Sequence, residues 1–265
     1  RRRLSLPTIA AIAVSALVAM PIIAIFLIGL GGGSDNWQHM LTNVVPRAAG
    51  RTLLLLALTG ALTASIGIVS AWLVASCDFP FRRLLSVALV LPLAIPSYLA
   101  AYAFGEFLDF TGPVQGLYRS LFGFASARDY SFPDVRSLGG AVLVMTAVLY
   151  PYVYLLTRTA FIERAGGMLE ASRTLGLGPW RGFFRVSLPL ARPAVAAGAT
   201  LALMETLADY GTVSYFGVQT FTTGIYRAWF SLGDRIAAAQ LAAALLAFVI
   251  LVLLIEWRSR GRARF

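Results

Sequence analysis

Two carboxylic acids and two tyrosines lie inside apolar stretches of the sequence. Glu205 and Asp209 are four residues apart, and Tyr98 and Tyr102 repeat that spacing elsewhere in the chain. Residues four apart share one face of a helix, so each pair would present its oxygen atoms together. Carboxylate and phenol oxygens suit hard metal cations. The alternative is structural: acids inside a membrane usually pair with arginines, and the tyrosines would then only pack.

A second group of polar side chains gathers in residues 170–193, "EASRTLGLGPWRGFFRVSLPLARP", which contain four arginines. Residues 168–175 are expected to form a short helix, closed by Gly176 in the left-handed conformation that favours glycine. Pro179 suits the first turn of a second short helix. The pattern predicts a compact knob whose Leu, Trp and Phe side chains require a groove. A hairpin on the membrane surface, with arginines on lipid phosphates, is the alternative.

The composition indicates the environment that positions these groups. Of 265 residues, 58% are hydrophobic and only 13% are charged, which is typical of a membrane protein. A helix needs roughly 20 apolar residues to cross the hydrocarbon core. We therefore predict an all-α membrane protein with six transmembrane helices, the first of them uncleaved. The six segments lie near residues 8–30, 52–76, 84–105, 139–157, 194–216 and 236–256.

The placement of arginine predicts the orientation. The N-terminus, the 77–83 loop, the 158–193 loop and the C-terminal tail together hold 15 of the 22 arginines. Because arginine-rich loops stay in the cytoplasm, both termini and the 158–193 loop are expected there. Residues 106–138 are then the longest outer segment. A short helix after Pro113 is expected to lie at the membrane interface or to dock an external partner.

Several function classes are excluded by missing residues. Cys77 and His39 are the sole cysteine and histidine, so no disulfide framework or Cys/His metal cluster can form. The phosphate-binding pattern G-x-x-x-x-G-K-[ST] is absent, so the chain is expected to have no ATPase site of its own. The net charge is +10, but the sequence has no soluble domain that could carry a basic binding surface. This argues against a nucleic-acid-binding function. A proton-coupled secondary transporter remains an alternative, because buried acids also serve proton coupling.

The 170–189 segment resembles the cytoplasmic signature of binding-protein-dependent ABC importer permeases. That signature reads Glu-Ala-Ala, three residues, Gly, nine residues, Ile, one residue, Leu-Pro. The matching positions are Glu170, Ala171, Ser172, Gly176, Val186, Leu188 and Pro189. Ser172 replaces an alanine and Val186 an isoleucine. The resemblance implies a MetI-like type I importer architecture. It also implies a coupling helix between the fourth and fifth membrane helices, which seats on an ATPase subunit.

Longer stretches resemble the N-terminal half of ferric-iron importer permeases: residues 71–83, 89–104, 148–161 and 201–230. Residues 1–265 are accordingly expected to be a single permease domain and one half of a two-half pathway. The implied location is the bacterial inner membrane. The implied partners are two cytoplasmic ABC ATPases, a periplasmic iron-binding protein, a second six-helix half and the lipid bilayer. No cofactor is expected on this chain, since ATP and Mg²⁺ are used by the partner ATPase. Polyamine, thiamine, sulfate and phosphonate permeases share the architecture and remain alternatives.

The candidate pathway residues are Glu205, Asp209, Tyr98 and Tyr102. Asp209 is nearer the outer end of its segment and is expected to pair with Arg227 or Arg235. Glu205 is deeper and is expected to face the pathway, because a carboxylate facing lipid is the most costly arrangement.

Overall fold

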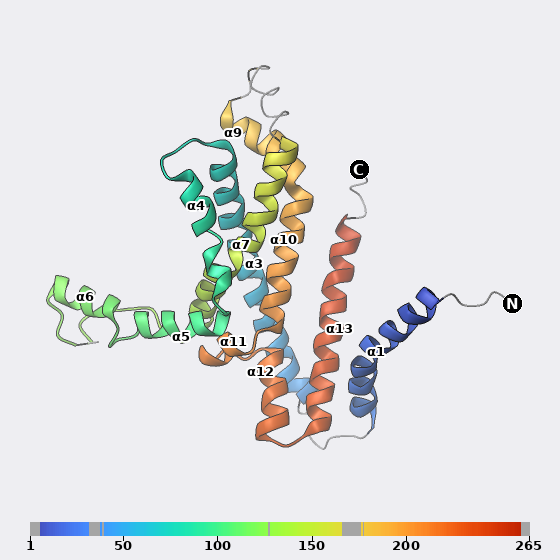
Figure 1. The fold of residues 1–265 in the computed structure, drawn as a ribbon. Helices are drawn as coiled ribbons and strands as arrows, with labels where there is room; N and C mark the ends of the chain where they lie inside the picture. The colour runs from blue at the N-terminus through green and yellow to red at the C-terminus, as the bar shows by residue number, and fades with distance from the viewer. Residues whose placement is uncertain are drawn as a thin grey trace. The chain divides into compact units, whose positions relative to one another are not determined.

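A computed structural model describes residues 6–31, 38, 40–126, 128–165, 176 and 178–260. Every regular element in these ranges is a helix, which confirms the all-α fold (Figure 1). The chain divides into two compact units. Unit 1 comprises Arg1–Thr52 with Gln219–Phe265, and unit 2 comprises Leu53–Val218.

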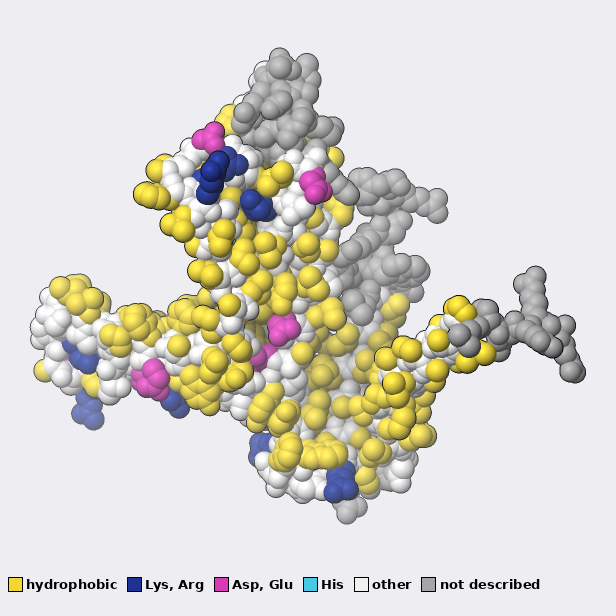
Figure 2. Space-filling view, in the orientation of Figure 1, with side chains coloured by type: hydrophobic (Ala, Val, Ile, Leu, Met, Phe, Trp, Pro, Cys, Tyr) yellow, Lys and Arg dark blue, Asp and Glu magenta, His cyan; other side chains and the backbone are white. Residues whose placement is uncertain are grey.

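Unit 1 pairs segments from opposite ends of the sequence. Its elements are α1 (Leu6–Leu30), η1 (Met40–Val44), the start of α3 (Val45–Ser76), α12 (Phe221–Tyr226), η5 (Arg227–Ser231) and α13 (Arg235–Arg260). Gln240 Nε2 of α13 donates a hydrogen bond to the carbonyl oxygen of Gly29 in α1, at 3.1 Å. No side chain described in α1 is buried, and hydrophobic groups cover its surface (Figure 2). Such a surface requires lipid or a protein partner.

Unit 2 is built on three long helices that run side by side: the rest of α3, α7 (Leu138–Ala160) and α10 (Leu188–Ala208) (Figure 1). Val153 of α7 lies between glycines of its two neighbours. A Cβ atom added to Gly67 of α3 would lie 2.6 Å from the Val153 Cβ. A Cβ atom added to Gly198 of α10 would lie 2.7 Å from the Val153 Cα. Small residues thus allow the three backbones to approach closely, as is common between membrane helices.

This close approach predicts that Gly67→Ala destabilises the fold by about 1–3 kcal/mol, the usual cost of overpacking. The added methyl group would also meet the Tyr154 backbone nitrogen at 2.9 Å, so the helices must separate. Gly50 is a matched control in the same helix, because a Cβ atom there meets nothing within 4 Å. Thermal unfolding of both purified variants measures the difference. Equal midpoints for Gly67→Ala and Gly50→Ala would contradict the close packing.

The third apolar segment is not one continuous helix. It is divided into α4 (Arg82–Ala88), η2 (Leu91–Ala94) and α5 (Ser97–Leu108), followed by α6 (Pro113–Phe122). The two halves of this run are bent by 99°. Ile95 is extended, at φ −103° and ψ 120°, because the ring of Pro96 disfavours helical geometry in the preceding residue. The segment predicted over 84–105 is therefore helical but broken at Ile95 and Pro96, and the short helix predicted after Pro113 is confirmed as α6.

The count of six membrane helices is not confirmed. Within the described residues, four helices are long and apolar enough to cross a membrane: Pro7–Leu30, Thr42–Ser76, Leu138–Glu163 and Pro179–Ala208. The bent pair would make a fifth, and the apolar part of α13, Arg235–Leu251, is shorter. The span predicted over 194–216 begins earlier and ends at Ala208, so Asp209 lies beyond its end.

Candidate functional site

The predicted coupling motif is described only in part. Glu170, Ala171 and Ser172 lie outside the described residues. Gly176 has φ +82°, which confirms the expected left-handed conformation. The segments α9 (Pro179–Gly182) and η4 (Phe183–Ser187) then continue into α10 as one helix of 30 residues. A separate second short helix was therefore the wrong expectation.

The remaining motif positions, Val186, Leu188 and Pro189, lie within this continuous helix, at the junction of η4 and α10. The same helix joins them without a break to the rest of α10. Any displacement of the segment after Gly176 would therefore move α10 directly.

Aromatic side chains hold the start of this helix against its neighbours. The Trp72 ring of α3 lies 5.3 Å from the Trp180 ring and 5.0 Å from the Phe183 ring, centroid to centroid. Phe183 is buried, whereas Trp180 and Phe184 are 64% and 60% exposed. Sequence reasoning did not single out Trp72, because nothing local to α3 indicates a contact with α9. The segment is thus packed against α3 through Trp180 and Phe183, and the rings of Trp180 and Phe184 remain more than half exposed.

The two acids of the fifth apolar segment have different surroundings. Glu205 is exposed on α10, on the same face as Leu201 and Met204, and no hydrogen bond or ion pair of its side chain is found among the described residues. Asp209 follows the last turn of α10 and is half-buried. The pair that the sequence placed on one helical face is therefore divided between a helix and the turn after it.

The Asp209 carboxylate accepts hydrogen bonds from two other segments. Ser97 Oγ of α5 donates to Oδ2 at 2.7 Å. The backbone N–H of Thr212 donates to Oδ1 at 2.9 Å, and that of Val213 at 3.1 Å. The Thr212 hydroxyl donates to Oδ2 at 3.0 Å. Asp209 thus caps α11 (Gly211–Tyr215) and ties it to α5, which is a structural role carried by hydroxyl and amide donors.

The predicted partners of Asp209, Arg227 and Arg235, belong to unit 1, whereas Asp209 and all its donors named above belong to unit 2. The structural role of Asp209 stays a prediction. The hydroxyl of Ser97, which donates to Asp209, comes from a helix 112 residues away in sequence, so no local pattern indicates it.

The two tyrosines lie along α5 and are about half exposed, Tyr98 at 47% and Tyr102 at 54%. Tyr98 packs so closely on Gly211 that a Cβ atom there would lie 2.6 Å from the Tyr98 Cβ. The Tyr102 ring lies 4.6 Å from the Tyr215 ring, so both tyrosines contact α11. Glu106 continues their four-residue spacing and is also exposed. Sequence reasoning missed Glu106, although the spacing was available to find it.

The described residues contain no group of three or more histidine, cysteine or acidic side chains arranged to hold a metal ion. Tyr98, Tyr102 and Asp209 each contact α11, whereas no hydrogen bond joins Glu205 to either tyrosine in the described part of the chain. The arrangement therefore offers a surface with oxygen atoms rather than a closed metal centre.

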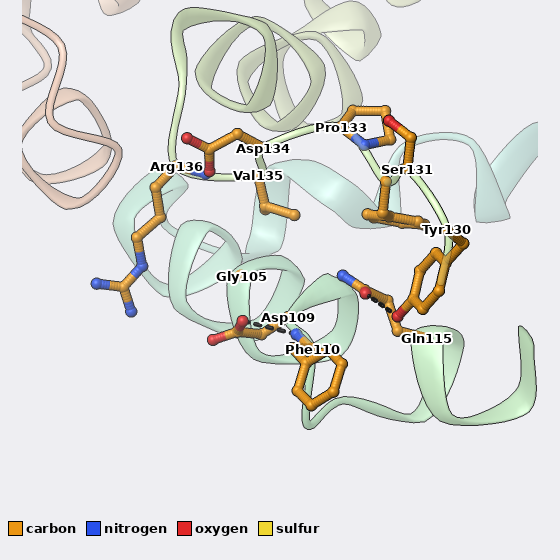
Figure 3. A pocket seen from close by; sticks show the side chains of 11 residues that line it. Gly105, Asp109, Phe110, Gln115, Tyr130, Ser131, Pro133, Asp134, Val135 and Arg136 are labelled. Carbon is orange, nitrogen blue, oxygen red and sulfur yellow. Dashed lines mark hydrogen bonds between the residues drawn. The ribbon is translucent and has the colours of Figure 1, made fainter. Parts of the chain in front are cut away.

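A cavity of about 430 Å³ lies between the end of α5 and residues 130–136 (Figure 3). Asp109 and Phe110 form one side of the cavity and Asp134 the other, and Tyr130 Oη donates to Gln115 Oε1 at 2.6 Å. The cavity is thus lined by charged, polar and aromatic groups from an irregular segment.

Close to this cavity, backbone groups hold the 125–129 turn. The backbone N–H groups of Ser126 and Ala125 donate to Asp129 Oδ2, at 2.7 and 2.9 Å. These bonds, that from Ser126 foremost, lower the pKa of the Asp129 carboxyl. The turn is therefore fixed by an ionised acid at neutral pH.

Residues 63–258 match the family described as "Binding-protein-dependent transport system inner membrane component". The molybdenum transport system permease protein ModB of Escherichia coli K12 is 30% identical over 201 residues, which cover 73% of this chain and 84% of that protein.

A second relative is named for iron. The Fe(3+)-transport system permease protein FbpB 2 of Haemophilus influenzae is 27% identical over 221 residues, covering 82% of this chain but 39% of that protein. Among solved structures, a permease chain of the bacterial alginate ABC transporter in complex with a pentasaccharide-bound periplasmic protein superimposes with a TM-score of 0.77 at 17% identity. The match covers 96% of this chain and 93% of that chain.

Proposed function

The chain belongs to the family of binding-protein-dependent transport system inner membrane components, and from this membership we propose that it forms one half of a pathway that carries ferric ion. The family supplies the membrane-embedded permeases of ABC importers, multi-pass proteins whose ATP is hydrolysed by partner subunits. The matched region crosses both compact units, which supports one permease domain. The relative named for ferric iron extends well beyond the region matched here, which supports a second half.

The observation that carries the iron proposal is the exposure of Glu205 on an otherwise apolar face of α10. A charged group facing hydrocarbon costs about 2.5–3.5 kcal/mol on insertion scales. A water-filled path between two halves removes that cost. Tyr98 and Tyr102 of α5 add exposed phenol oxygens, and ferric ion prefers such hard donors.

A tetrahedral oxyanion is the second candidate for the cargo. It is favoured by the molybdenum permease, which matches this chain over most of both lengths. An oxyanion would be repelled by an ionised Glu205 in its path, whereas ferric ion would be attracted. The two candidates therefore make opposite demands on the same residue.

Uptake into proteoliposomes decides between the two cargoes. The complete transporter, with its ATPase and binding protein, is expected to accumulate radioactive ferric ion when ATP is supplied, and to take up molybdate and sulfate no faster than without ATP. ATP-driven uptake of molybdate with no uptake of iron would reject the iron proposal and establish the second candidate. Uptake of either ion without the ATPase would indicate a secondary transporter.

We place the contact with the partner ATPase at the segment that begins with Glu170 and ends with Pro189. The exposed rings of Trp180 and Phe184 support this assignment, because exposed aromatic rings are enriched at protein interfaces. Because Phe183 packs on Trp72, a movement of the ATPase at that interface would displace α3 as well as α10. Both termini would then lie in the cytoplasm, and the cavity in the outer segment would face the periplasmic binding protein.

Gly176→Val tests this contact surface. A β-branched residue at φ +82° is strained by roughly 1–2 kcal/mol, so the preceding segment must change direction. We expect ATP-driven uptake to fall roughly tenfold, with weaker co-purification of the ATPase. Gly178→Val is the matched control, because Gly178 has φ −65° and its Cβ position is open. Full uptake by Gly176→Val would indicate a surface hairpin instead of a coupling segment.

A further inference from the structure

Unit 1 contains a cavity of about 450 Å³ that the transport proposal does not use. It is formed where the start of α3 meets the segment that leads into α12 and η5. Its polar lining residues are Asn43, Arg47, Gln219, Thr220, Thr223 and Arg227. Two arginines separated by 180 positions in the sequence thus line one cavity.

The two guanidinium groups place positive charge at this cavity, and no described acidic side chain pairs with them. Within the described residues, neither Arg47 nor Arg227 has a side-chain hydrogen bond or an ion pair. None of the lining residues that the structure describes is acidic. Arginine stays charged at any physiological pH, so the cavity has a permanent positive potential.

The rest of the wall is held in place by its own bonds. Thr220 and Thr223 cap α12 reciprocally: the Thr220 backbone N–H donates to Thr223 Oγ1 at 2.8 Å, and the Thr223 N–H donates to Thr220 Oγ1 at 3.5 Å. Asn43 Nδ2 donates to Thr42 Oγ1 at 3.0 Å. The cap keeps Arg227, which directly follows α12, in a defined position at the cavity wall.

A second, mostly apolar cavity of about 330 Å³ shares Val44, Gly224 and Arg227 with the first. Its acid, Asp234, accepts the backbone N–H of Ala237 at Oδ1, 2.9 Å away, and so caps α13. Basic side chains are visible at this end of unit 1, where α12 leads into α13 (Figure 2). The arginines therefore stand beside an apolar space.

We propose that the cavity lined by Arg47 and Arg227 binds a phosphate-like oxyanion, either as a free ion or as the headgroup of an anionic lipid. Guanidinium groups bind phosphate oxygens through two parallel N–H bonds, which gives such sites geometric specificity. The apolar neighbouring cavity has room for part of an acyl chain. The site is independent of the cargo, because it lies in unit 1 and the cargo proposal rests on side chains of unit 2.

Binding measurements on the full chain, purified in an uncharged detergent, test the site without any transport step. The free-ion arm uses inorganic phosphate, with sodium chloride at matched ionic strength as the reference, and reads the midpoint of thermal unfolding. The lipid arm reconstitutes the protein in phosphatidylcholine vesicles with and without phosphatidylglycerol. It counts the phosphatidylglycerol retained after extraction. The variants are Arg47→Gln, Arg227→Gln and their combination, with Arg51→Gln as the control, since Arg51 is one turn further along α3 and does not line the cavity.

The dissociation constant of the ligand is expected to rise roughly tenfold in each single variant and to be unchanged in Arg51→Gln. Stabilisation by phosphate supports a free-ion site, and retention of phosphatidylglycerol alone supports a headgroup site. If the double variant keeps both the stabilisation by phosphate and the retention of phosphatidylglycerol, the proposal is overturned. Should that variant fail to fold, wild-type protein still decides: sodium chloride must weaken the binding of whichever ligand is bound, phosphate or phosphatidylglycerol. The absence of both anion and lipid binding in the wild type also overturns it.

Discussion

Replacing Asp209 by alanine is expected to lower the midpoint of thermal unfolding by roughly 6–12 °C, which corresponds to about 3 kcal/mol for a chain of this size. The carboxylate accepts four hydrogen bonds, from Ser97, Thr212 and Val213. Its removal leaves two hydroxyls and two backbone N–H groups without their acceptor, and bonds to charged groups contribute about 1.5–3 kcal/mol each before non-additivity. Thermal unfolding in detergent, with wild-type protein beside it, measures the shift.

Asp209→Asn provides a graded comparison. Its single carbonyl oxygen can keep two of the four bonds, while its NH₂ group faces donors, so the loss should be smaller than for alanine but still clear. Ser97→Ala removes one bond from the other side and should cost about 1 kcal/mol. An unfolding midpoint within 1–2 °C of wild type for Asp209→Ala, less than the roughly 2–4 °C expected for a single kcal/mol, would refute the structural role.

Glu205→Gln is expected to have the opposite profile, with near-normal stability but transport reduced roughly tenfold or more. Glu205 has no side-chain bond within the described residues, so its charge can be removed without stranding a partner. If the carboxylate attracts a passing cation, a loss of about 1.4 kcal/mol of that attraction already reduces the rate tenfold. The measurements are cargo uptake, basal ATPase activity and the unfolding midpoint of the same preparation.

Glu163→Gln serves as the control for Glu205→Gln, because Glu163 is an exposed acid that lies after the end of α7 and is not part of α10. It should transport normally. Unchanged ferric uptake by a well-folded Glu205→Gln protein would rule out the pathway role. A large drop in its thermal stability would instead show that Glu205 is a structural acid.

Local sequence determined the apolar helices that cross the membrane without interruption. The segments predicted over 8–30 and 139–157 appear as α1 and α7 with small changes at their ends, because a long apolar run in a bilayer must satisfy its backbone within itself. The left-handed conformation of Gly176 could also be predicted, since a positive φ depends on residues beside it in the chain. The family signature at 170–189 belongs to the same class of local information.

Only the tertiary structure decided where these helices break and which polar groups meet. The third segment was apolar enough to span, but Pro92 and Pro96 divide it, and other helices must supply the surroundings of the bend. Asp209 and Glu205 are equivalent by spacing. They differ because α5 brings the Ser97 hydroxyl to one of them and leaves the other exposed.

The cavity of unit 1 also could not be predicted from the sequence. Arg47 and Arg227 carry no shared sequence signal, and each reads as an ordinary arginine of an outer loop. Their convergence follows from the packing of the start of α3 against α12 and η5, between residues at opposite ends of the chain. Hydropathy and spacing describe each segment by itself, whereas a binding site is a property of segments that fold together.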